Sequence, residues 1–255
     1  KMKRRTFLAN SGKIGMTLSV SSVIPARGFA AMMPSELTSL SAIDLSIAIQ
    51  EKHVSCVEVM QAYLDRIHRY NDVYNAIVSL QPDDDLITQA LEADNELAKG
   101  NYRGWMHGMP HAVKDLTAVK GIRYTSGSLL YSDRIAEQDS AMVARIRNAG
   151  AIFIGKTNTP EFGLGSQSYN LIFGATGCAY NPELTSGGSS GGAGCGLATQ
   201  MLPVADGSDM MGSLRNPGAF NNVIGYRPST NVMSGRDATQ RSLSTSGPMG
   251  RNTAD

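Results

Sequence analysis

Cysteine and histidine are scarce in this sequence, and the spacing of the few that are present argues against two classes of site. Phe, Trp and Tyr make up 6% of the 255 residues, and there are only three cysteines and four histidines. The cysteines form no Cys-x-x-Cys pair, and no histidine stands at metal-ligand spacing to them. This pattern argues against a structural zinc site and against a disulfide framework. We therefore expect the cysteines to be buried as small apolar side chains.

A large excess of charge is also missing. The net charge is +1, and residues 1–30 hold six basic side chains and no acidic one. The rest of the chain is thus mildly acidic, which argues against nucleic acid as its main ligand. No stretch approaches the roughly 18 apolar residues of a transmembrane helix, so we expect no stable insertion into a membrane.

The N-terminal residues have the three parts of a targeting segment. Arg4-Arg5 begins a basic region, residues 14–24 form a weakly apolar run, and small residues around Ala30 offer a cleavage point. This order predicts a twin-arginine signal peptide over residues 1–31, with export to the periplasm or beyond and a mature domain over residues 32–255. A basic, disordered N-terminus is the alternative.

Three segments of the mature part show helical periodicity with a recognisable start, over residues 55–71, 83–99 and 139–150. The first opens with a Ser-x-x-Glu capping box. Gly100 is placed to end the second, and Asp139 is placed to cap the third. The side chains of the third that we expect to face inward are Met142, Val143 and Ile146.

Short apolar runs alternate with these helices. Residues 111–113, 151–154 and 202–205 are typical of buried strands, and their alternation with helices indicates a layered α/β domain. Gly and Ser concentrate over residues 186–196 and 206–213, where we expect the chemistry to lie.

Two motifs match familiar patterns but lack the context that those patterns need. Residues 150–157 match the phosphate-loop letters, yet the residues between the glycines are themselves strand-like and Asn-Thr-Pro follows. Residues 187–191 match G-x-S-x-G, whose acid and histidine must follow the serine. All four histidines precede Ser189, so that triad cannot form within this chain.

Three segments remain, over residues 108–115, 186–192 and 207–217. The first ends a predicted strand with Lys114, and the other two are rich in Gly and Ser. Without histidine, a serine nucleophile needs another base, and a buried lysine with a lowered pKa can serve. A second hydroxyl can relay the proton, and tightly turned backbone amides can stabilise an oxyanion.

In this order, the three segments resemble the amidase signature family. The resemblance runs over roughly residues 40–255 and includes Lys-Thr-Asn-Thr-Pro-Glu-Phe at 156–162 and Phe-Gly-Ala-Thr-Gly at 173–177. It implies a layered α/β/α domain with a mixed central sheet. It also implies hydrolysis of a small-molecule carboxylic amide to an acid plus ammonia or an amine, through an acyl-enzyme and with no metal or organic cofactor.

The resemblance assigns roles to individual residues. Ser213 would be the nucleophile, Ser189 the proton relay held by a cis peptide bond from Gly188, and Lys114 the neutral base. The oxyanion hole would be formed by the backbone amides of Met210, Met211, Gly212 and Ser213. Supporting positions, which hold the loop in shape, would be Ser190, Ser208, Asp209 and Arg215.

Two departures and the length leave alternatives open. Met211 stands where many family members have glycine, and Cys178-Ala179 stands where Asn-Pro is common. Family members are about twice as long, so the domain is expected to be truncated at its C-terminus, with residues 31–255 poorly stable and weakly active alone. A non-catalytic remnant and a glutamyl-tRNA amidotransferase A-type subunit are the alternatives, although the export signal and Met211 weigh against the latter.

Overall fold

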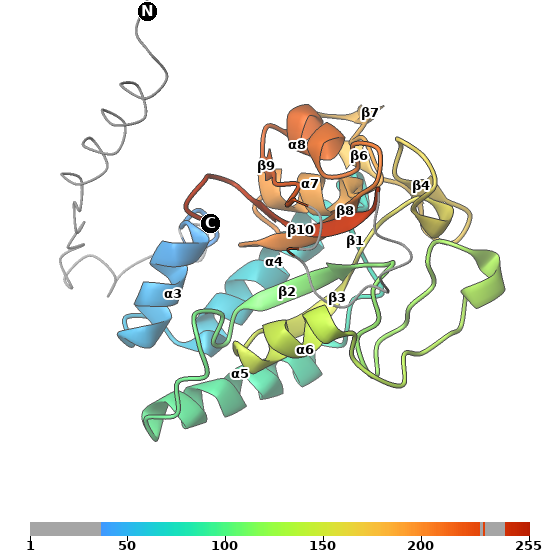
Figure 1. Ribbon diagram of the computed structural model, residues 1–255. Coiled ribbons are helices and arrows are strands. Elements are labelled where there is room, and N and C mark those ends of the chain that lie inside the picture. The colour runs from blue at the N-terminus through green and yellow to red at the C-terminus, as the bar shows by residue number, and fades with distance from the viewer. Residues whose placement is uncertain (1–36, 230–231, 233–242) are drawn as a thin grey trace, which may run out of the picture. The chain divides into compact units, whose positions relative to one another are not determined.

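The computed structural model describes residues 37–229, 232 and 243–255 (Figure 1). The predicted signal peptide, residues 1–31, lies outside the described residues and stays a prediction. None of the helices within the described ranges has the length and apolar content needed to cross a membrane.

The first two described helices are α3 (Ala42–Gln50) and α4 (Cys56–Tyr74). The capping box predicted for the start of α4 is confirmed. The Ser55 hydroxyl accepts from the Glu58 N–H at 3.1 Å, and the Glu58 carboxylate accepts from the Ser55 N–H at 2.8 Å. Both groups satisfy amide donors that a helix start leaves unpaired. The helix runs beyond the predicted end and stops where Asn75 adopts a left-handed conformation.

The predicted second helix is confirmed as α5 (Asp83–Ala98). Three aspartates occupy its first turn, where negative charge is favoured by the helix dipole. Gly100 follows with a φ of +84°, which agrees with its predicted part in ending the helix.

The third helix, α6 (Ala141–Asn148), does not begin as predicted. Ser140 caps it, not Asp139: the Ser140 hydroxyl accepts from the Val143 N–H at 3.3 Å. Asp139 instead pairs with Arg147 at 2.6 Å. The two residues are neighbours with similar capping propensity, and the ion pair draws the aspartate away from the helix start.

The central strands are β1 (Ile77–Val78), β2 (Pro110–Lys114) and β3 (Ile152–Thr157), in the order β1-β3-β2. β2 and β3 are parallel, and β1 is antiparallel to β3, so the sheet is mixed. The predicted strands at 111–113 and 151–154 are confirmed, with slightly different bounds. The connection from β2 to β3 contains α6, as a parallel crossover requires.

A second group of strands continues this layer. It consists of β8 (Ala205–Asp209), β9 (Ile224–Gly225) and β10 (Thr245–Gly250), with β10 antiparallel to both others. β8 lies beside β2. The backbone N–H of Lys114 donates to the Asp206 carboxylate at 3.3 Å. The second group is thereby joined to the end of β2.

The strand predicted at 202–205 is wrong except for its last residue. The structure starts β8 at Ala205, and the preceding apolar residues are buried without joining a strand. Pro203 lacks the N–H that a central strand needs. The apolar run therefore indicates that these residues are buried, but not that they pair with a neighbouring strand.

Helices cover both faces of the sheet, as expected for a layered α/β/α domain. Val113 of β2 and Phe153 of β3 pack against Val143 on one face. Because successive strand residues point to opposite faces, Lys114 points to the other face, where α7 (Gly191–Ala198) packs. Figure 1 shows α6 and α4 on opposite sides of β2. The α6 residues that pack on the first face are Met142, Val143 and Ile146.

Short elements complete the described chain, and all three cysteines are free and buried, as predicted. The antiparallel pairs are β4 with β5 and β6 with β7. The bounds of the short elements are η2 Leu129–Tyr131, η3 Glu161–Gly163, β4 Tyr169–Asn170, β5 Gly174–Ala175, β6 Gly177–Cys178, β7 Asn181–Thr185 and α8 Arg215–Asn221.

Helix α5 offers a matched test of the core. Leu86 is 0% exposed and Leu91 is 54% exposed on the same helix. Leu86→Ala should lower the free energy of unfolding by about 2–5 kcal/mol, because it removes buried methyl groups and leaves a cavity. Leu91→Ala should change it by less than about 0.5 kcal/mol. Urea unfolding of both variants checks this, and equal losses would contradict the assigned orientation of α5.

Candidate active site

The candidate site is centred on a buried lysine. Lys114 is the last residue of β2 and is 1% exposed. Its Nζ donates to the Ser189 hydroxyl at 2.7 Å and to the Ser190 hydroxyl at 2.8 Å. A third bond goes to the Ser208 hydroxyl at 3.0 Å. The structure thus joins the predicted base and the predicted relay directly, and adds two of the supporting serines.

The start of α7 and strand β8 hold these serines in place. The peptide bond from Gly188 to Ser189 is cis, as the resemblance implied. Ser190 is the N-cap residue of α7, and its hydroxyl accepts from the Ser208 N–H at 3.3 Å. A Cβ added at Gly207 would lie 2.7 Å from the Ser190 hydroxyl oxygen. Glycine at this position therefore allows β8 to approach α7 closely.

The predicted nucleophile, Ser213, lies in the loop between β8 and α8. Its carbonyl accepts from the Ser190 N–H at 3.2 Å, which places it next to the lysine cluster. Its hydroxyl makes no hydrogen bond to any other residue that the structure describes. The structure therefore brings Ser213 beside the predicted relay, without a contact between their hydroxyls.

A buried carboxylate shapes this loop. The side chain of Asp209 is 0% exposed and accepts from the Gly212 N–H at 2.9 Å and the Leu214 N–H at 3.2 Å. Arg215 binds it through two nitrogens, at 3.0 and 3.1 Å. Such a paired arrangement fixes both distance and direction. Asp209 and Arg215 therefore lie where supporting residues were predicted, on both sides of Ser213.

The electrostatics of this loop favour a charged Asp209. Burial alone would raise the pKa of the carboxyl, but hydrogen bonds from Arg215 and from the two loop amides outweigh it. They lower its pKa to about 2. The carboxylate therefore stays ionised at all ordinary pH values and keeps both loop amides bound.

Arg227 belongs to the same network, although it was not among the predicted residues. Its Nη1 donates to the Asp209 carbonyl and, at 3.2 Å, to the Asp209 carboxylate. Its Nη2 donates to the Leu243 carbonyl at 2.8 Å. No motif in the sequence marks this arginine, because its partner lies 18 positions earlier and the pairing depends on the antiparallel strands.

The predicted oxyanion donors differ in their availability. The Gly212 N–H is bound to Asp209, so it is already occupied in this arrangement. The amides of Met210, Met211 and Ser213 donate to no residue among those described. Gly212 has a φ of +115°, a conformation that favours glycine and turns the chain toward Ser213.

A second buried lysine lies on the other face of the sheet. Lys156 belongs to β3, which confirms that the phosphate-loop letters fall on a strand. Burial lowers its pKa to about 8, against the opposing effect of the Asp115 carboxylate. Its Nζ donates to the Thr117 carbonyl, and Asp115 accepts from the Gly127 N–H at 3.4 Å. These two bonds connect the ends of β2 and β3 to the segment between β2 and α6.

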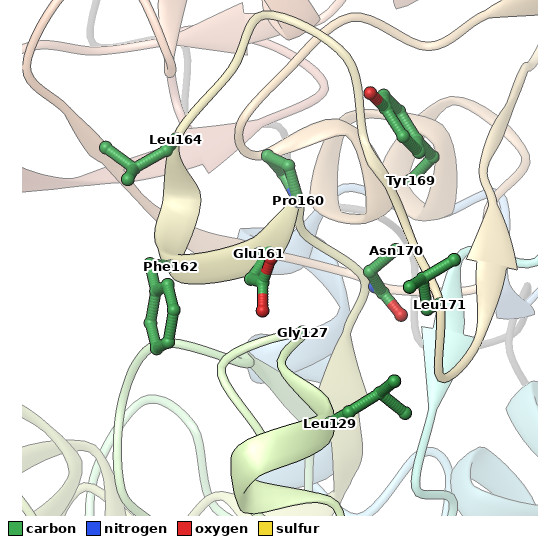
Figure 2. Close-up of a pocket in the computed structure, with 9 residues that line it drawn as sticks. All are labelled: Gly127, Leu129, Pro160, Glu161, Phe162, Leu164, Tyr169, Asn170 and Leu171. Atoms are coloured by element: carbon green, nitrogen blue, oxygen red, sulfur yellow. The ribbon is translucent and has the colours of Figure 1, made fainter.

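A cavity of about 430 Å³ lies beside the cluster, between η2 and the segment from η3 to β4 (Figure 2). Its wall includes Phe162 and Leu164. A Cβ added at Gly163, between them, would lie 3.6 Å from the Ser189 hydroxyl oxygen. The wall of the cavity thus comes close to Ser189.

Comparisons with known proteins agree on one family. A family model described as Amidase matches residues 58–255. The A subunit of glutamyl-tRNA(Gln) amidotransferase from Coxiella burnetii (strain Dugway 5J108-111) is 37% identical over 214 residues, which are 83% of this chain and 44% of that protein.

Solved structures give the same result. The peptide amidase from Stenotrophomonas maltophilia matches with a TM-score of 0.76 and 30% identity, over 84% of this chain and 46% of that one. A fatty acid amide hydrolase matches with a TM-score of 0.79 and 28% identity, over 87% of this chain and 40% of that one. The chain therefore spans less than half the length of each of these relatives.

The Asp209 network makes stability depend on acid pH. The folded pKa of about 2 lies below the value of roughly 3.9 in an unfolded chain. The carboxylate therefore stabilises the fold above about pH 4, and about 2–3 kcal/mol of this should be lost as the pH falls toward 2. Urea unfolding at pH 5 and pH 2 measures it. Asp209→Asn should show a loss smaller by that amount, and an unchanged pH dependence would contradict the assignment.

Proposed function

Because the chain belongs to the amidase family, we propose that it carries the reacting groups of an enzyme that hydrolyses carboxylic amides with a Ser-Ser-Lys triad. The observation that carries the proposal is the 2.7 Å hydrogen bond from Lys114 to Ser189 inside a buried cluster. A lysine removed from water loses its charge more readily than an exposed one, which suits it to the part of a base.

In the first step, the Ser213 oxygen attacks the amide carbonyl carbon. Its proton passes to the Ser189 oxygen, whose own proton passes to the neutral amine of Lys114. The carbonyl becomes a tetrahedral oxyanion. When this intermediate collapses, the carbon–nitrogen bond breaks, and the proton returns from Lys114 through Ser189 to the departing nitrogen. Ammonia or an amine leaves, and Ser213 holds the acyl group as an ester.

In the second step, water replaces the amine. Lys114 again receives a proton through Ser189, this time from the water that attacks the ester. The carbon–oxygen bond to Ser213 then breaks, the proton returns from Lys114 through Ser189 to the Ser213 oxygen, and the carboxylic acid leaves. The Ser213 hydroxyl must reach Ser189 for either step, and such contacts are often loose before substrate binds. The bond between the Ser190 N–H and the Ser213 carbonyl keeps the two loops close enough for this.

Backbone amides around Ser213 are suited to stabilise the oxyanion. We propose Met210, Met211 and Ser213 as donors, since their N–H groups are not engaged by any described residue. The Gly212 amide would join them only if it left Asp209. One well-placed donor of this kind typically contributes about 100- to 1000-fold in rate.

A second candidate function is that of an amidotransferase component acting on tRNA. It is favoured by the 37% identity to the A subunit of glutamyl-tRNA(Gln) amidotransferase. The proposed twin-arginine signal over residues 1–31 separates the two, because an exported enzyme would not act on tRNA in the cytoplasm. Fusing residues 1–31 to a reporter that works only after twin-arginine export tests the signal, and Arg4→Lys with Arg5→Lys should abolish transport. Retention of the reporter in the cytoplasm would favour the amidotransferase.

The nucleophile can be tested by covalent labelling. A fluorophosphonate should modify Ser213 of the 255-residue chain, since the reaction mimics acylation. Ser213→Ala should abolish labelling, and Ser189→Ala or Lys114→Ala should slow it by about 100- to 10,000-fold, as expected when proton transfer is lost. Intact-mass spectrometry with peptide mapping measures both the site and the rate.

Ser132→Ala is the matched control for the labelling, because Ser132 is on the surface and its hydroxyl bonds only to Asp133 among the described residues. It should label at the rate of the original chain. A folded chain that takes no label at Ser213 would support the non-catalytic remnant instead.

A further inference from the structure

We propose that the cavity beside Ser189 binds a cationic group of the substrate, with Glu161 as its counter-ion. This rests on the proposed function, and it names the substrate class: amides with an apolar body and an ammonium group at the end distant from the reacting carbonyl.

The cavity is near enough to the reacting groups to hold part of the same molecule. A Cβ on Gly163 would lie 3.6 Å from the Ser189 hydroxyl oxygen. Glu161 precedes Gly163 by two residues in the same short turn, η3, so their Cα atoms are less than about 8 Å apart. A substrate whose carbonyl reaches Ser189 needs only a short apolar spacer to place a charge at Glu161.

The cavity combines one carboxylate with apolar and aromatic side chains. Glu161, Phe162, Leu164, Tyr169 and Leu171 all line it. Figure 2 shows the Glu161 carboxylate directed toward the segment of Gly127 and Leu129, between Phe162 and Leu171. No basic residue is among the described residues that line the cavity. An apolar wall with a single acid favours a ligand that is apolar along its length and positive at one point.

Glu161 has no protein counter-ion among the residues that the structure describes. Its side chain makes no ion pair or hydrogen bond with any of them. Arg134 lies close to the same wall, but its guanidinium binds other groups. It donates to the Tyr124 carbonyl at 2.8 Å and the Ser126 hydroxyl at 3.1 Å, and stacks on Tyr131 at 4.0 Å. The carboxylate is therefore available to an external cation.

The backbone that carries the acid is held rigidly. Phe162 has a φ of +53°, an uncommon conformation for a bulky residue. Its N–H donates to the Ser126 carbonyl at 2.7 Å, and its ring contacts Tyr131 edge-on with centroids 6.2 Å apart. Strained residues persist where surrounding contacts over-determine them, often at ligand sites. These contacts fix the backbone of η3, so that the Glu161 backbone needs little ordering when a ligand binds.

Binding of a matched pair of probes tests the proposal without depending on turnover. We expect 4-phenylbutylamine, which is cationic, to bind the full chain about 3- to 10-fold more tightly than neutral 4-phenylbutan-1-ol, as measured by saturation-transfer NMR titration. Glu161→Gln removes the charge and preserves the shape, so it should abolish the difference. Glu183→Gln, at an exposed glutamate on β7, should leave it intact.

The outcomes separate this inference from the proposed function. Equal binding of the two probes, or a preference for the amine that survives in Glu161→Gln, overturns the cation site. Failure of the original chain to acylate at Ser213 overturns the proposed function but does not alter the binding result. Preference for the amine that is lost in Glu161→Gln and kept in Glu183→Gln supports the site.

Discussion

The rest of the site depends on the hydrogen bonds of the Lys114 side chain. One largely buried nitrogen binds hydroxyls from the start of α7 and from β8, at 2.7 to 3.0 Å. A buried amine is unfavourable unless it is fully hydrogen-bonded, so the strand, the helix start and the second group of strands must meet around it. The same hydrogen bonds therefore hold β2, the start of α7 and β8 together and bring the candidate site residues into contact.

Much of this arrangement is visible in the sequence, because it is encoded locally. The capping box at Ser55 fixes a helix start from residues three positions apart. The apolar run before Lys114 predicts a buried strand. The order of the three Gly- and Ser-rich segments identifies the family, and with it the cis bond before Ser189.

The features that the sequence does not reveal are set by competition or by distant pairing. Asp139 and Ser140 are both good caps, and an ion pair with Arg147 decides between them. Pro203 interrupts an apolar run that otherwise looks like a strand. Arg227 reaches Asp209 only because β9 and β8 both lie against β10. The Gly212 amide donates to the Asp209 carboxylate because the loop folds back on β8, and no sequence pattern indicates this fold.

The register of β2 against β3 has a consequence for folding fidelity. Val113 stands opposite Lys156, and Lys114 stands opposite Thr157, so the two buried lysines point to opposite faces. An irregularity between His111 and Ala112 sets this alignment. A slip of one residue would turn Lys114 toward the apolar face under α6 and Val113 toward the serines. The misaligned chain would separate the Lys114 amine from its three hydroxyl partners and bury it on the face that already holds Lys156, so the Lys114 cluster also selects against incorrect strand pairing.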